Sequence, residues 1–352
     1  MQHAASNNFD CVRLLAALAV MYSHQVKLTD RGIVAVSAYH DLGKMGVLVF
    51  FAISGYLVMQ SWERDPHLGR FLARRLLRIW PGLVCVMLLT LLVLGPALTT
   101  LPPADYFRSP QTWDFASHLW FIVGEQQLPG VFGGHAIQRV NGPLWTIPLE
   151  MGWYVVLAAL GVTGLLRYRF AVPVATLACA LYVFGVYGAQ RPGVERWWPM
   201  EFGLFFLYGA CMHAGRHLWQ PRPWRAALCA VALAGIAWAL GHDYVAIWLA
   251  LPCLTVLAAQ ASTPLVRDAG RYGDFSYGIY IYSFPLQQTV IWLTANALGL
   301  WTGMALSLAV TMMFAWASWR LVEQPALGWK RLLRPAGHRT ERGANPAGAA
   351  RA

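Results

Sequence analysis

The ionisable residues with the clearest chemical potential in this sequence lie inside apolar stretches, where a charge is costly and usually serves a function. Arg13 and His24 are eleven residues apart in FDCVRLLAALAVMYSHQ. At about 100° per residue, this spacing places both side chains within about 20° of one helix face, roughly 16 Å apart along the axis. An imidazole at one end of such a stripe is suited to general-base chemistry on a hydroxyl group.

Depth in the apolar stretches suggests a carboxylate partner for His24. We expect His24 to lie about one turn inside the outer end of its helix, and Glu150 about two turns inside the outer end of an antiparallel helix. A carboxylate at that depth could fix the tautomer of the imidazole and raise its basicity. The alternative is a helix-end histidine that faces interfacial water and a glutamate that bonds to a neighbouring helix. Two more carboxylates, Glu201 and Glu323, lie at helix ends, and Glu323 could equally pair with a loop arginine.

A basic cluster in RFLARRLLRIWP, residues 70–81, could bind phosphate. Arg75 and Arg78 are three residues apart on one side of a helix start, and Arg74 is adjacent. Guanidinium groups bind phosphates in a bidentate manner, so the cluster could hold a phosphorylated cofactor. The alternative is ordinary cytoplasmic charge that contacts anionic lipid headgroups. In FFAISGYL, Ser54 and Gly55 could serve a site or simply allow close helix packing.

The elements that must position these residues are membrane helices. The chain has 352 residues, of which 57% are hydrophobic and 12% are charged, against about 45–50% and about 25% in soluble domains. We predict an all-α polytopic membrane protein, a bundle of about ten transmembrane helices with one long extracytoplasmic loop. The apolar runs cover roughly residues 11–27, 45–61, 79–99, 144–164, 170–188, 199–215, 225–241, 244–261, 274–294 and 299–321.

The net charge of +11 fits membrane topology better than nucleic-acid binding. With a cytoplasmic N-terminus, the inside segments hold 19 Lys and Arg residues and the outside loops hold 7, as the positive-inside rule requires. Both termini are therefore predicted to be cytoplasmic. A cleaved signal peptide is the competing interpretation of the first run, but residues 1–10 of the chain carry no Lys or Arg, which a signal peptide needs.

The remaining segments carry weaker signals. Residues 100–143 form the long loop, and TWDFASHLWFIVG within it is apolar but too short to span, which favours an interfacial or re-entrant helix. We assign residues 1–325 to one transmembrane domain and residues 326–352 to a basic cytoplasmic tail, with disorder expected beyond Arg334. The six scattered cysteines indicate neither disulfides nor a metal site. Hydrolase, zinc-protease and nucleotide-binding motifs are absent from the sequence.

Six segments, taken in chain order, resemble the motifs of the integral-membrane acyltransferase-3 family. Each motif is weak alone, but six in the same order are not expected by chance, and they extend from residue 9 to residue 325. The segments are FDCVRLLAALAVMYSHQ with Arg13 and His24, GVLVFFAISGYLV with Ser54, RRLLRIWP with Arg75 and Arg78, PLWTIPLEMGWY with Trp145, Glu150 and Tyr154, FSYGIYIYSFP with Tyr277, and LVEQP with Glu323.

The sequence departs from the family pattern at two positions. Leu48 replaces a residue that is often polar, and Ser283 replaces a histidine, which leaves His24 to act without a second imidazole. The chain is too short to include the SGNH-type hydrolase domain that some members carry, so it resembles the stand-alone form.

The resemblance implies a membrane O-acyltransferase that moves an acyl group, usually acetyl, from cytoplasmic acyl-CoA to a hydroxyl of an extracytoplasmic or lipid-linked glycan. It implies that Arg13, Arg75 and Arg78 bind the phosphates of CoA, and that His24 and Glu150 serve the transfer without a metal. The partners expected are membrane lipid and a carbohydrate acceptor, with no nucleic acid. A transporter or flippase of a lipid-linked sugar is the rival hypothesis, and a passive membrane scaffold is a third. The acceptor sugar, the acyl group and the choice between a base and an acyl-carrying His24 stay open.

Overall fold

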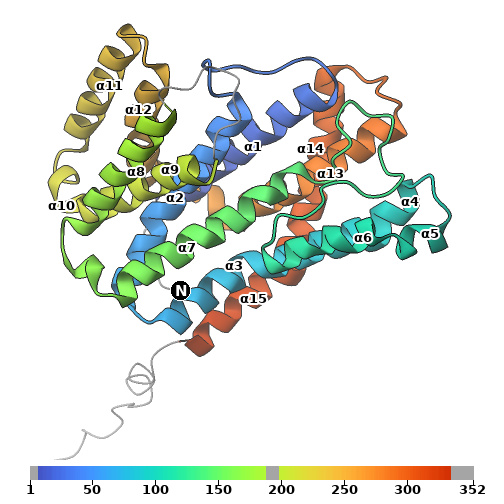
Figure 1. Cartoon of the computed structure of the whole chain (residues 1–352), viewed down its shortest axis with the longest axis horizontal. Coiled ribbons are helices and arrows are strands. Elements are labelled where there is room, and N and C mark those ends of the chain that lie inside the picture. The colour runs from blue at the N-terminus through green and yellow to red at the C-terminus, as the bar shows by residue number, and fades with distance from the viewer. Residues whose placement is uncertain (1–6, 188–197, 334–352) are drawn as a thin grey trace, which may run out of the picture.

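The computed structural model describes residues 7–187 and 198–333, and their regular structure is helical (Figure 1). Ten helical segments coincide with the ten apolar runs. In chain order they are α1 (Phe9–Leu28), α2 (Leu42–Arg64), α3 (Leu68–Leu89) continued to α4 (Gly95–Leu98), α7 (Thr146–Val162), α8 (Ala171–Tyr187), α9 (Trp198–Ala214), α11 (Pro223–Ala239), α12 (Asp243–Gln260), α13 (Ser276–Leu293) and α14 (Leu300–Ser318).

Five of these segments are long and apolar enough to cross a membrane by length and composition. Two others are apolar but shorter, Ala171–Gly185 and Pro223–Ala239. The helical class is therefore confirmed, while ten membrane spans stay a prediction. The five long segments are Leu42–Arg64, Leu68–Leu98, Gly142–Val162, Asp243–Gln260 and Leu300–Leu333.

Helices α8, α9, α11 and α12 gather at one end of the molecule, and α3, α13 and α14 lie toward the other (Figure 1). Between these groups, α1 packs against α2 and α13, and α2 packs against α9. Two glycines allow the α2–α9 contact: a Cβ on Gly55 would lie 1.8 Å from the carbonyl oxygen of Phe206, and one on Gly209 would lie 2.0 Å from that of Ala52. Close helix packing therefore explains Gly55.

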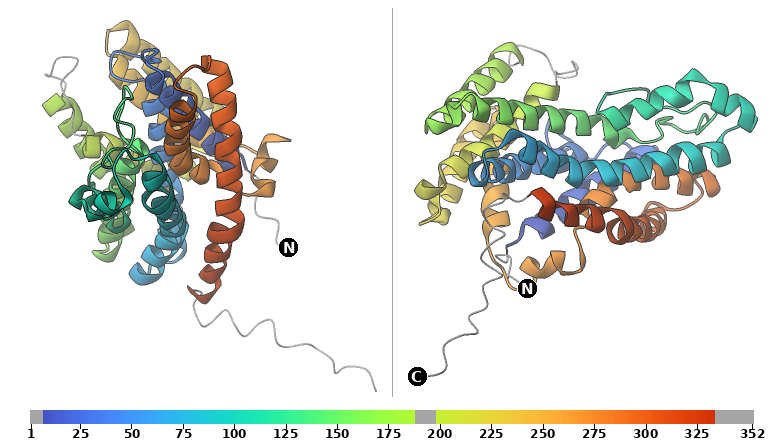
Figure 2. Two further views of the ribbon diagram at one scale, coloured as in Figure 1. Left: turned by 90° about the vertical axis from the view of Figure 1, so that its right-hand side faces the viewer. Right: turned by 90° about the horizontal axis from the view of Figure 1, so that it is seen from below.

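Two wide π-helical turns precede prolines that cannot donate an amide hydrogen bond. The first, Thr90–Leu94, joins α3 to α4 just before Pro96, and the second, Trp319–Glu323, joins α14 to α15 (Gln324–Gly328) just before Pro325. A 3₁₀ turn, Trp329–Leu333, continues α15. The resulting rod, α14 to residue 333, extends along one flank of the molecule (Figure 2). Residues 326–333 of the expected tail are thus helical, and its remainder lies outside the described residues.

The segment 100–143 contains short helices rather than one interfacial helix. They are α5 (Pro103–Arg108), α6 (Pro110–Phe115) and the 3₁₀ turn Ala116–Trp120. Trp80 of α3 donates a hydrogen bond to the carbonyl of Leu119 at 3.1 Å, which ties the segment to the bundle. Chain 121–141 is irregular before the 3₁₀ turn Gly142–Trp145 that precedes α7.

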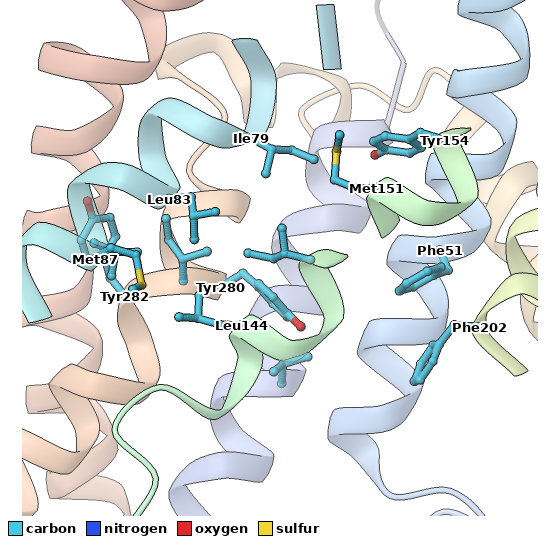
Figure 3. Packing of buried hydrophobic residues seen from close by; sticks show 14 of the residues in the cluster. Phe51, Ile79, Leu83, Met87, Leu144, Met151, Tyr154, Phe202, Tyr280 and Tyr282 are labelled. Carbon is cyan, nitrogen blue, oxygen red and sulfur yellow. The ribbon is translucent and has the colours of Figure 1, made fainter. Parts of the chain in front are cut away.

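The main apolar core lies where α3, α7 and α13 meet (Figure 3). Ile79, Leu83 and Met87 project from α3 at helical spacing, and buried Tyr280 and Tyr282 project from α13. Several residues of this core, among them Ile79, Tyr154 and Tyr280, also line the cavity described next.

Candidate active site

A cavity of about 570 Å³ opens among α2, α3, α7, α13 and the α15 end of the chain. On α2 its lining runs from Val47 to Arg64, which corresponds to roughly 25 Å along the helix axis. Charged residues concentrate at the Arg64 end, whereas Val47, Phe50 and Thr146 line the opposite end. The cavity is therefore an elongated passage with one cationic mouth.

Cations outnumber carboxylates along this passage. Six basic side chains and three carboxylates line it. Cavities with an excess of one charge attract ligands of the opposite charge. The basic residues are Arg13, Arg64, Arg74, Arg75, Arg78 and Lys330, and the acidic residues are Asp65, Glu150 and Asp274.

Asp274 joins two of the predicted arginines. Its carboxylate accepts a short hydrogen bond from Arg78 and lies 3.3 Å from an Nη atom of Arg13. Ser276 also donates to it, at 2.5 Å. Asp274 precedes α13, so this ion pair connects the starts of α1 and α13 with α3.

Asp65 forms a second ion pair at the mouth. It follows α2 and accepts hydrogen bonds from Arg70, at 2.6 Å, and from Arg74, at 2.7 Å. The hydrogen bonds from Arg70 and Arg74, together with the charges of both arginines, hold the pKa of Asp65 well below its usual range. Asp65 is therefore ionised at physiological pH and partly offsets the charge of Arg74.

Arg75 lacks such a counter-charge. Among the residues that the structure describes, no carboxylate lies within ion-pair distance of it. One Nη atom donates a long hydrogen bond of 3.4 Å to Ser61, and the buried Nε has no partner. A guanidinium group in a cavity with unused donors is suited to an anionic ligand.

Glu150 lies in the middle of the passage. Its Oε1 accepts hydrogen bonds from Ser54, at 2.6 Å, and from Tyr154 one turn along α7. All three side chains line the cavity. In Figure 3, Tyr154 lies beside Met151 at one end of the core. Ser54 therefore has a polar role in addition to being a small residue at a helix contact.

His24 is not paired with Glu150, contrary to the expected dyad. Among the described residues, Glu150 bonds to Ser54 and Tyr154, whereas the buried Nδ1 of His24 has no hydrogen-bond partner. The His24 ring packs edge-on against Phe284, with ring centroids 5.0 Å apart. The expectation assumed that the two residues have similar depths. Ser23, next to His24, lies against Gly43 of α2, whereas Glu150 bonds to Ser54, eleven residues and roughly 16 Å further along that helix.

His24 also lies beyond the end of the described cavity. Tyr280 lines that end and exchanges a hydrogen bond with Thr146 at 2.7 Å. Phe284, which touches His24, is one turn further along α13, or about 6 Å. The cavity thus ends at Tyr280, roughly one helical turn short of Phe284, which contacts His24.

The other residues selected from the sequence divide between cavity and packing. Tyr277 lines the cavity and donates to the carbonyl of Ile79 at 2.7 Å. Trp145 packs near Phe202, with ring centroids 5.5 Å apart. Glu323 is buried, accepts from Ser318 at 2.8 Å and does not line the cavity. Glu201 lies 2.8 Å from Lys44 at the start of α2, and neither residue lines the cavity.

Sequence reasoning missed Asp274 and Lys330. Asp274 lies at the edge of an apolar run. The criterion that selected Glu201 and Glu323, an acidic residue at a helix end, could have selected it as well. Lys330 lies in the basic segment that the sequence assigned to a cytoplasmic tail, so nothing in the sequence marked it as a site residue. Both enter the site because segments far apart in the chain meet at the mouth.

The described residues contain no group of three His, Cys, Asp or Glu side chains placed to hold a metal ion. The six cysteines are free thiols. The site is thus defined by a cationic mouth, a hydroxyl–carboxylate cluster and an imidazole beyond it, within an apolar helical bundle.

Comparison with known proteins identifies the class to which this arrangement belongs. The sequence profile described as an acyltransferase domain matches residues 6–320. The chain belongs to the acyltransferase-3 family, and it is a membrane acyltransferase.

Two relatives match over nearly their whole length. An "O-acetyl transferase" of Shigella phage Sf6 is 31% identical over 330 residues, which cover 91% of this chain and 95% of the relative. "Nodulation protein 10" of Rhizobium leguminosarum bv. viciae is 29% identical over 346 residues, covering 91% of this chain and 93% of the relative. "Regulator of hypoxia-inducible factor 1" of Caenorhabditis elegans is 30% identical over 173 residues, 42% of this chain and 32% of that protein. No solved structure matches the chain.

Proposed function

We propose that this protein transfers an acyl group, acetyl in the simplest case, from cytoplasmic acyl-CoA to a hydroxyl of an extracytoplasmic or lipid-linked glycan. The observation that carries the proposal is the elongated cavity, whose cationic mouth leads past Glu150 toward His24. The name of the phage relative, an O-acetyl transferase, supports acetyl as the group transferred. The thioester supplies the driving force, so the proposed reaction does not depend on a metal.

Arg75 and Arg78 would bind the phosphates of the donor at the mouth, and the apolar passage beyond them would hold its extended thioester arm. Arg13 would act with Arg78 through their shared partner Asp274. An anion that competes with Asp274 for Arg13 and Arg78 can accept charge-assisted hydrogen bonds from both guanidinium groups at one position.

His24 would serve the acceptor side. As the acceptor hydroxyl attacks the thioester carbonyl, its proton would pass to His24, the carbon–sulfur bond would break, and CoA thiolate would leave toward the mouth. The buried Nδ1 of His24 has no hydrogen-bond partner among the described residues, which supports a role in binding a substrate group. The transfer requires Tyr280 and Phe284 to admit the acyl group, because Tyr280 lines the end of the cavity and Phe284, one turn further along α13, contacts His24.

The proposal places the protein in a bacterial-type inner membrane as a multi-pass protein with both termini in the cytoplasm. The arrangement supports one part of this proposal, that both ends lie on the same side: Arg13, near the start of the chain, and Lys330, near the end of the described part, line the same cavity.

The test is label transfer in the host membrane. Vesicles that contain the protein, its glycan precursors and acetyl-CoA labelled in the acetyl group should produce labelled glycan. His24→Ala should reduce the initial rate by at least about 10²-fold, the contribution expected of a general base, at equal protein abundance. The matched control is His217→Ala, which removes an exposed imidazole on α10 (Arg216–Trp219).

Unlabelled glycan that nevertheless crosses the membrane would favour the flippase hypothesis. Retained transfer by His24→Ala would contradict the role assigned to His24. Mass spectrometry of glycans from cells with and without the protein would identify both the acceptor and the added acyl group.

A further inference from the structure

Three of the six cations that line the cavity have no counter-charge. Arg13 and Arg78 share Asp274, and Arg74 is paired with Asp65. In the described part of the chain, no carboxylate lies within ion-pair distance of Arg64, Arg75 or Lys330. These three come from separate segments, namely the end of α2, the first half of α3 and the 3₁₀ turn Trp329–Leu333.

Lys330 is the least expected member of this group. The neighbouring Trp329 and Leu332 are 64% and 72% exposed, whereas Lys330 is partly buried and lines the cavity. The charged groups that act most strongly on it are four arginines, Arg75, Arg78, Arg74 and Arg13. Like charges gathered around a partly buried ammonium group repel one another, and an anion bound among them would relieve that repulsion.

The cations lie at successive depths. Arg75 bonds to Ser61, which is about one turn inward from Arg64 on α2, and Arg78 is about one turn deeper than Arg75 on α3. Arg64, the last residue of α2, therefore marks an outer level, and Lys330 reaches the cavity from the end of the rod, whose 3₁₀ turn Trp329–Leu333 packs against α3. A ligand with phosphates at two separated positions would match an inner pair of arginines and an outer pair of cations.

Coenzyme A has this distribution of charge. Its diphosphate joins the thioester arm to the ribose, and its third phosphate is on the 3′ position of that ribose, farther from the thioester. We propose that Lys330, together with Arg64, binds the 3′-phosphate of the donor and makes the enzyme discriminate CoA from dephospho-CoA. This inference rests on the proposed function, because it assumes that acyl-CoA enters with its thioester directed inward.

The experiment measures binding, so that it does not depend on the unidentified acceptor. The full-length protein in phosphatidylcholine nanodiscs is titrated with labelled acetyl-CoA, and CoA and dephospho-CoA are compared as competitors. We expect the unsubstituted protein to prefer CoA by about tenfold, the value of one charge-assisted contact. Lys330→Gln should weaken CoA binding by a similar factor, leave dephospho-CoA binding unchanged, and so abolish the preference.

The matched control is Arg331→Gln, which removes the same charge from the adjacent, exposed position. It should retain both the affinity and the preference for CoA. A Lys330→Gln protein that keeps the preference of the unsubstituted protein would overturn the inference, while CoA binding itself would still support the proposed function. Failure of the unsubstituted protein to bind acetyl-CoA would instead contradict the proposed function, and the inference with it.

An anionic lipid headgroup offers the same phosphate chemistry, and a second arm distinguishes it. Phosphatidylglycerol in the nanodiscs should weaken acetyl-CoA binding only through the repulsion of an anionic surface. If Lys330 contacts the nucleotide, this weakening should be the same in the unsubstituted protein and in Lys330→Gln. Competition by phosphatidylglycerol that disappears in Lys330→Gln, without a change in the preference for CoA, would assign Lys330 to the lipid and overturn the inference.

Discussion

At the scale of single residues, a serine hydroxyl and a tyrosine hydroxyl donate hydrogen bonds to one carboxylate in the cavity. Ser54 and Tyr154 both donate to Oε1 of Glu150, so the second carboxylate oxygen remains available to the cavity. A hydrogen-bonded carboxylate held in an apolar passage can orient a polar group of a ligand or take part in proton transfer. Packing alone would be satisfied by residues without charge.

We predict that Glu150→Gln lowers the rate of acyl transfer by about 10²-fold, because it removes the charge but keeps an acceptor oxygen for Ser54. Ser54→Ala should have a smaller effect, about tenfold, since Glu150 keeps its bond to Tyr154. Initial rates at saturating donor would measure both effects. Equal rates for Glu150→Gln and the unsubstituted protein would restrict Glu150 to a structural role.

A second prediction concerns the counter-charge at the mouth. Asp65→Asn should tighten the binding of acetyl-CoA by about three- to tenfold, because Arg74 loses the carboxylate that now occupies it. Arg75→Gln should weaken binding by a similar factor. Equilibrium binding at low ionic strength would measure both, and weaker binding in Asp65→Asn would show that Asp65 serves to position the arginines.

The low pKa of Asp65 determines how this effect responds to pH. Because the hydrogen bonds from Arg70 and Arg74 depress the pKa, the carboxylate stays ionised as the pH falls through the usual range of an aspartate, near 3.9. Its ion pairs would be lost only at still lower pH. Between pH 5 and pH 8, the pH dependence of donor binding should therefore be the same in the unsubstituted protein and in Asp65→Asn.

At the scale of helices, the close contact between α2 and α9 fixes the wall of the cavity that carries Ser54. Gly55→Ala would place a methyl group against the backbone of Phe206, and overpacking of this kind typically costs about 1–3 kcal/mol. We expect a melting temperature several degrees lower in detergent, with reduced activity. The control is Gly235→Ala on α11, where a Cβ meets no atom within 4 Å. This substitution should be neutral or stabilising, since alanine favours helix.

The helices and part of the site could be predicted from the sequence, for definable reasons. Length and hydropathy located all ten helical segments, and motif order selected Arg75, Arg78, Ser54 and Glu150, all of which line one cavity. Which atoms pair could not be predicted, because Arg78 and Asp274 are separated by 196 residues. For the same reason, the apolar runs suggested a His24–Glu150 pair, whereas the packing of α1 and α7 against α2 places the two residues at different levels of the bundle.

At the scale of the whole molecule, the two ends of the described chain meet at the cationic mouth. Arg13 and Lys330 line the same cavity, while His24 lies toward the other end of α1. The irregular chain 121–141 is linked to α13 through Gln288, which donates to the carbonyls of Ile137 and Arg139. The mouth and this loop therefore belong to opposite sides of the bundle, and orientation in the membrane decides which side meets cytoplasmic acyl-CoA.

We predict that an epitope tag inserted between Gly133 and Gly134 is accessible to antibody in intact spheroplasts, whereas a tag at the C-terminus is accessible only after permeabilisation. The insertion should be tolerated, because a Cβ at either glycine meets no atom within 4 Å. Activity of the tagged protein is the control for correct folding. The reverse accessibility would direct Arg75 and Lys330 away from the cytoplasm. Cytoplasmic acyl-CoA could then not reach the arginines from their open side, and the donor would have to be a phosphorylated compound of the opposite compartment.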